Sequence, residues 1–135
     1  MSDVSALSHE YQTSAKLAEE LNDAIIAIKK AKLHRRSSLD QNERRRLAVT
    51  LRAVRNRLAH DAKGPEEIVP QEVVERLVGK HGAKMAYFLD DLTAATEALS
   101  APSASISDTI IQLLDEICDA ADQTASSMFR RLRRR

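Results

Sequence analysis

The chain has 135 residues, which is enough for one domain with a single hydrophobic core. Aromatic residues make up 3% of it, Trp is absent, and there are only three glycines and three prolines. Abundant Ala, Leu, Glu and Arg then favour helices over sheet, so we expect an all-α protein with an aliphatic core.

The only cysteine, Cys118, excludes an internal disulfide framework and a cysteine-based zinc site, which suits a reduced cytoplasm. We expect its side chain to pack in the core. No apolar run approaches the roughly 18 residues of a membrane span, and the first residues lack an export signal. We therefore expect a soluble, cytoplasmic protein that makes no membrane contact.

The net charge of +1 conceals strong segregation of charge along the chain. Residues 29–63 hold twelve Lys or Arg against three acids, whereas residues 64–129 hold three basic residues against twelve acids. The last six residues add five arginines. Such basic segments attract anions such as nucleic acid. The alternative is that the acidic helices neutralise the basic one within the same bundle.

The first two expected helices are amphipathic. One runs from about Val4 to Leu33, and residues 34–38 break its pattern. Ser38 or Asp40 can cap the second helix, expected from about Gln41 to His60, and Glu43 makes a plausible capping box with Asp40. The expected core positions are Leu7, Tyr11, Ser14, Ala18, Leu21, Ile25 and Ile28 in the first helix and Leu47, Leu51, Val54 and Leu58 in the second.

A third helical segment begins near Pro70, is interrupted at Gly79–Gly82, and resumes at Met85. Residues 100–105 form a linker, and the last helix runs from about Ser107 to Phe129. The sequence thus predicts an antiparallel bundle of four long helices, one of them interrupted near Gly79–Gly82. Residues 1–129 form one domain, and residues 130–135 form a basic tail that we expect to be disordered when unbound.

The second helix carries the best candidate site, in the segment RNRLAH. At about 100° per residue, Arg52, Asn56 and His60 form one polar row that points away from the apolar stripe, and Arg55 lies between that row and the core. A histidine with a pKa near ~6.5 can exchange protons at neutral pH, and a guanidinium can hold a phosphate. The bland alternative for His60 is a solvent-exposed histidine at a helix end.

RNRLAH resembles the motif of the HEPN superfamily, in which an Arg, commonly followed by Asn, is separated by four to six residues from a His. The resemblance covers about ten residues as motif and most of the chain as architecture. It implies a helical homodimer in which two motifs face one another, and an endoribonuclease toxin in which Arg55 and His60 are catalytic and Asn56 shapes the site. In one subgroup a tyrosine that is nucleotidylated by a partner enzyme lies two residues after the histidine; here Ala62 stands there.

We expect RNA cleavage without a metal or other cofactor, through attack of a ribose 2′-hydroxyl that yields a 2′,3′-cyclic phosphate. One chain offers one histidine at this site, so we expect a two-fold dimer to supply a second His60. With few aromatic residues, base stacking is poorly provided for, and sequence specificity should be low. The residues expected to follow the RNA backbone are Arg44, Arg45, Arg46, Arg52 and Arg57.

Other histidines and acids fit a site less well. His9 and His81 lack nearby partners in the sequence, and Asp90 and Asp91 point to different faces of a helix. Two alternatives to the ribonuclease remain open: a non-catalytic HEPN-like module that binds nucleotide, RNA or a regulatory protein such as an antitoxin, and a purely structural bundle.

Overall fold

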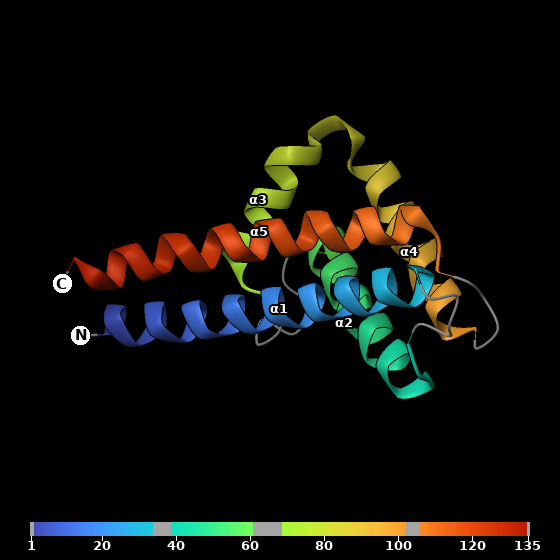
Figure 1. The fold of residues 1–135 in the computed structure, drawn as a ribbon. Coiled ribbons are helices and arrows are strands. Elements are labelled where there is room, and N and C mark those ends of the chain that lie inside the picture. The colour runs from blue at the N-terminus through green and yellow to red at the C-terminus, as the bar shows by residue number, and fades with distance from the viewer. Residues whose placement is uncertain (1, 34–38, 61–68, 102–105, 135) are drawn as a thin grey trace.

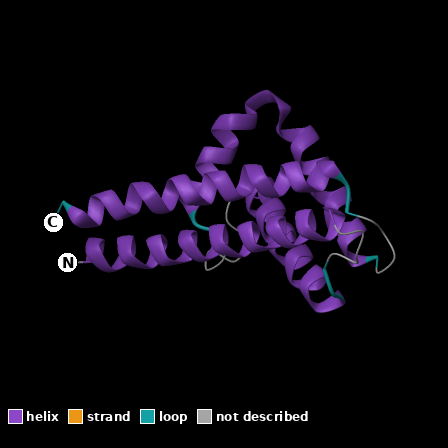
Figure 2. Cartoon of the chain, in the orientation of Figure 1, coloured by secondary structure: helices purple, strands orange, loops and turns teal. Residues whose placement is uncertain are grey.

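The computed structural model describes residues 2–33, 39–60, 69–101 and 106–134, and within these every regular element is helical (Figures 1 and 2). The elements in chain order are α1 (Ser2–Leu33), α2 (Gln41–His60), α3 (Gln71–His81), the 3₁₀ turn η1 (Gly82–Lys84), α4 (Met85–Ser100) and α5 (Asp108–Arg133). The predicted all-α bundle is confirmed, with α3 and α4 as the two halves of the interrupted helix.

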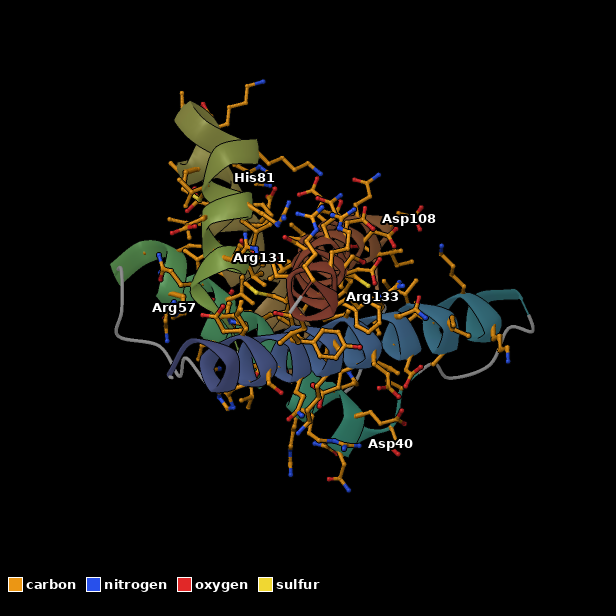
Figure 3. The ribbon with its side chains drawn as sticks, turned by 90° about the vertical axis from the view of Figure 1, so that its left-hand side faces the viewer. Asp40, Arg57, His81, Asp108, Arg131 and Arg133 are labelled. Atoms are coloured by element: carbon orange, nitrogen blue, oxygen red, sulfur yellow. The ribbon has the colours of Figure 1, made fainter. Side chains whose placement is uncertain are left out.

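The helices pack mainly as two antiparallel pairs. In the first pair Tyr11 of α1 lies against Phe129 of α5, and Ala18 lies against Cys118. In the second pair the start of α2 contacts the end of α4. Figure 3 looks almost along α5, and α1 runs across that view, so these two helices cross obliquely. The buried apolar side chains of the five α-helices nevertheless form one contiguous core.

The predicted apolar stripes account for most of that core. All the expected core positions of α2 are buried, as are those of α1 from Ser14 onward. The exceptions are Leu7 and Tyr11, which lie near the start of α1 and are half-buried. The periodicity of three and four residues therefore identifies the buried faces correctly.

Local capping groups fix where two helices begin. The Glu43 backbone N–H donates to Asp40 Oδ1 at 2.8 Å, and the Asp40 N–H donates to Glu43 Oε1 at 3.2 Å, which confirms the predicted capping box. At the start of α5 the Ile110 N–H donates to the Ser107 hydroxyl.

The break between α3 and α4 lies slightly later than predicted. Gly79 remains within α3, and the helix ends at His81 because Gly82 adopts φ 46° and ψ −119°. That conformation is open to glycine and disfavoured for residues with a Cβ. The chain changes direction there, and α4 returns toward α2 (Figure 1).

Helix α5 also ends later than predicted. It continues through Arg133, so Arg130–Arg133 belong to the helix and not to a separate disordered tail. Two contacts accompany this extension: Arg131 forms an ion pair with Glu72 of α3, and the Arg133 guanidinium lies over the Phe129 ring. Residues 61–68, which follow α2, and residues 102–105 of the predicted linker lie outside the described residues.

Candidate functional site

The guanidinium of Arg55 is held in a defined orientation on α2. Its Nε donates to the Thr93 hydroxyl of α4 at 2.7 Å, and its Nη1 donates to Asn56 Oδ1 at 3.3 Å. Thr93 donates its own hydroxyl proton to the Leu89 carbonyl, which leaves the oxygen lone pairs for Arg55. The side chain is half-buried, and Nη2 has no hydrogen-bond acceptor among the described residues.

Helix α2 continues without a break from Arg55 through Asn56 to His60. Asn56 is half-buried, and its side-chain oxygen is the group that accepts from Arg55. The structure thus brings Arg55 and Asn56 together as one hydrogen-bonded unit. The side chain of His60 and the whole of Ala62 lie outside what the structure describes, so their predicted roles remain predictions.

A basic strip lies on the exposed side of α2. Arg45, Arg46 and Arg52 are exposed, and none of them has an ion-pair partner among the described residues. Val49, which is also exposed, lies between Arg45 and Arg52 at helical spacing. These three arginines are therefore accessible to an anionic ligand.

Arg44 does not belong to this strip, although it was expected to contact RNA. It is 7% exposed, and its guanidinium donates to backbone carbonyls at the end of α4: Ala98 and Ala101 at 3.0 Å and Leu99 at 3.3 Å. The last carbonyls of a helix lack partners within the helix, so they accept readily from an arginine. Arg44 caps α4 and ties it to α2.

Arg57 is withdrawn from the surface in the same way. It is 1% exposed; its Nε donates to the Val69 carbonyl at 3.3 Å, and its Nη2 donates to Gln71 Oε1 at 2.7 Å. Its burial and these two bonds show that the side chain is directed into the bundle, toward the residues at the start of α3. The prediction that Arg57 follows the RNA backbone does not fit this placement.

His81 and Cys118 also have surroundings that differ from expectation. His81, which lacks a partner nearby in the sequence, has partners in the fold: its Nε2 lies 2.9 Å from Glu116 Oε2 of α5, and its ring stacks on Phe88 with a centroid distance of 3.9 Å. Cys118 is half-buried and its Sγ donates to the Ala18 carbonyl. Burial, followed by the nearby charges of Asp119, Asp122 and Asp115, raises the pKa of the Cys118 thiol.

Two further properties concern metal ions and membranes. The described residues bring together no group of three or more His, Cys, Asp or Glu side chains that could hold a metal ion. Within the same part of the chain, no helix has both the length and the apolar character needed to cross a membrane.

Thr93 is the one residue of this site that the sequence did not single out. Its role depends on how α4 packs against α2, and no local pattern distinguishes it from Thr96, the other threonine of α4. Only the pairing of the two helices shows that its hydroxyl faces Arg55.

Comparison with known proteins adds no relative: no family model, curated protein or solved structure matches the chain.

Proposed function

We propose that this chain is a metal-independent endoribonuclease of the HEPN type, acting in the cytoplasm as a toxin or defence effector. The observation that supports it best is the Arg55 guanidinium, which Thr93 and Asn56 hold while Nη2 stays available. A preorganised cation at the edge of a basic strip can bind a phosphate without reorganising first.

In the proposed reaction a ribose 2′-oxygen forms a bond to the adjacent phosphorus, and the bond from phosphorus to the 5′-oxygen breaks. One His60 accepts the proton of the 2′-hydroxyl, and a second protonated His60, from the other subunit of a two-fold dimer, donates a proton to the departing 5′-oxygen. Such acid–base catalysis is worth roughly 10²- to 10⁴-fold in rate. Arg55 stabilises the extra negative charge on the phosphate in the transition state, and Arg45, Arg46 and Arg52 hold the flanking backbone.

The test uses purified full-length protein and a single-stranded RNA substrate. Wild type should release products with 2′,3′-cyclic phosphate and 5′-hydroxyl ends, with unchanged yield in EDTA. His60→Ala and Arg55→Ala should each lower the rate by about 100-fold or more. The control His9→Ala removes an exposed histidine from α1 and should keep the wild-type rate.

The contact between Arg55 and Thr93 also favours a second candidate, a binding module that does not cleave. In that function Arg55 serves to join α2 to α4, and the basic strip binds RNA or a regulatory protein such as an antitoxin. Intact RNA after incubation with the folded wild type, together with measurable RNA binding that charge reversal at Arg52 abolishes, would replace the nuclease with this module. If that reversal leaves RNA affinity unchanged and no cleavage occurs, the chain is a structural bundle.

A further inference from the structure

The C-terminal turns of α5 present an aromatic side chain to solvent. The apolar face of α5 is buried, including Ile117, Thr124 and Met128, whereas Phe129 lies outside that face and is 45% exposed. Its ring lies 5.8 Å from the half-buried ring of Tyr11 on α1, tilted by 38°. Two of the four Tyr and Phe rings of the chain therefore meet at one place.

Arginines surround this aromatic pair. The Arg133 guanidinium lies over the Phe129 ring, 5.8 Å from its centroid. Arg130 and Arg134 are exposed and have no ion-pair partner among the described residues. Cations are favoured at the C-terminus of any helix, which accounts for the charge but not for the exposed aromatic ring.

A chain of side-chain contacts links this end of α5 to the C-terminal half of α2. Arg131 Nη2 is 3.2 Å from Glu72 Oε1, and the residue before Glu72 is Gln71, which accepts from Arg57 of α2. Figure 3 shows Arg57, Arg131 and Arg133 in one view of this end of the molecule. Arg57 lies about 200° around α2 from Arg55, so these contacts fix α5 against the side of α2 that faces away from Arg55.

A groove between α1 and α5 begins at the same aromatic pair. Its volume is about 780 Å³, and Tyr11, Phe129 and Arg130 line it together with Asp119 and Asp122. The two aspartates lie on α5 about two to four turns before Arg130 and Arg133, so the two charges are separated along the helix. A phosphate is favoured only at the basic end, next to the two rings.

We propose that a second binding site for single-stranded RNA, separate from the proposed cleavage site, is formed by Phe129, Tyr11, Arg130 and Arg133. A base stacks on the Phe129 ring, and the two arginines contact the adjoining phosphates; aromatic stacking next to guanidinium groups suits single strands of any sequence. The choice of RNA as the ligand rests on the proposed function. An anionic membrane surface is the poorer fit, because Phe129 is the only exposed large apolar residue of α5 and membrane binding needs a continuous apolar face.

The test measures binding with cleavage removed. Full-length His60→Ala protein is titrated into a short fluorescein-labelled oligoadenylate, and the Kd is read from fluorescence anisotropy. Adding Phe129→Leu, which keeps an apolar side chain but removes the ring, should raise the Kd about tenfold. Adding Arg130→Gln and Arg133→Gln should reduce the slope of log K against log salt by about 0.7 for each arginine.

Matched controls lie at the far corner of the fold. Tyr87→Leu removes an aromatic ring that is 73% exposed, and Lys84→Gln removes an exposed cation next to it; both should leave the Kd and the salt dependence unchanged. A Kd for Phe129→Leu equal to that of Tyr87→Leu overturns the second site, whatever the cleavage assay shows. The second site is also overturned if Phe129→Leu leaves the Kd for RNA unchanged and reduces only the sedimentation of the protein with phosphatidylserine vesicles. If Phe129→Leu weakens RNA binding although wild type cleaves no RNA, the second site stands and the nuclease function fails.

Discussion

The α2–α4 pair and the α1–α5 pair are both antiparallel, but different contacts hold them together. Between α2 and α4, Arg44 donates to the last carbonyls of α4 and Arg55 donates to Thr93. Between α1 and α5, the hydrogen bond found among the described residues is the one from Cys118 to the Ala18 carbonyl, at 3.4 Å. Apolar side chains such as Leu21 and Ile117 make up the rest of that interface.

This difference shows that the basic character of α2 serves two purposes. Arg44 and Arg57 belong to the fold, whereas Arg45, Arg46 and Arg52 face solvent. A charge count along the sequence cannot separate these groups. The predictions below test whether the two helix pairs depend on such different forces.

The largest expected effect is in the apolar pair. Ile117 is fully buried, so Ile117→Ala should lower the free energy of unfolding by about 2 to 5 kcal/mol, through lost apolar burial and the cavity left behind. Urea denaturation followed by circular dichroism measures this. The control Ile26→Ala, at a position 43% exposed on α1, should cost less than about 1 kcal/mol. Equal losses would show that the α1–α5 interface is not the main apolar contact.

The next effect concerns the buried arginine. Arg57→Ala removes donors to the Val69 carbonyl and Gln71 and should lower the free energy of unfolding by about 2 to 3 kcal/mol. Arg52→Ala, on the exposed face of the same helix, should change it by no more than about 0.5 kcal/mol. The same urea titrations compare the two. If Arg57→Ala lowers the free energy of unfolding as little as Arg52→Ala does, the hydrogen bonds of Arg57 do not stabilise the fold.

A smaller change in stability, but a clear one in activity, is expected at Thr93. Thr93→Val keeps the shape of the side chain and removes the acceptor for Arg55, so stability should fall by about 1 kcal/mol or less while kcat falls about 10- to 100-fold. Thr96→Val is the matched control, because the Thr96 hydroxyl also donates to the carbonyl four residues earlier but holds no arginine. Equal kcat for the two variants, measured in the RNA cleavage assay, would remove Thr93 from the site.

The smallest effect is the pH dependence of the capping box. The backbone hydrogen bond from Glu43 is the main cause that lowers the pKa of Asp40 below 3.8, helped by the Glu43 side chain and the charge of Arg46. The ionised Asp40 therefore stabilises the fold above its usual pKa, and that contribution is lost as pH falls through the lower folded-state value.

Asn caps a helix about as well as Asp, so Asp40→Asn isolates the contribution of the charge. Wild type should unfold at a higher urea concentration than this variant at neutral pH, and the difference should vanish in strong acid. A difference that persists in acid, as expected for Asp40→Ala, would assign the effect to the cap alone.

The sequence predicts most of the fold because the relevant signals are local. Asp40 and Glu43 are three residues apart, and α2 begins at Gln41, as predicted. The apolar stripes likewise depend on spacing within a single helix. Only the positions of the helix ends at Gly82 and Arg133 differ, and both involve contacts or conformations that spacing does not reveal.

The candidate site is less predictable because its partners are distant in sequence. Thr93 lies 38 residues after Arg55, and Arg44 meets carbonyls more than 50 residues away. Likewise, Tyr11 and Phe129 are far apart in the sequence but form an aromatic pair in the fold. The low aromatic content of the chain does not reveal this stacking surface. These contacts depend on which helices pack together, and local sequence patterns do not reveal that.

Gly82 affects a site that it does not contact. Its positive φ lets the chain leave α3 and return as α4, yet a Cβ built on it would meet nothing within 4 Å. Substitution there is therefore penalised by backbone conformation and not by crowding, at about 1 to 3 kcal/mol. Surface positions in open space usually tolerate any residue. Gly82 is an exception. It contributes no atom to the site at Arg55, but it sets the direction of α4, which carries Thr93. A substitution at Gly82 therefore also disturbs the site at Arg55.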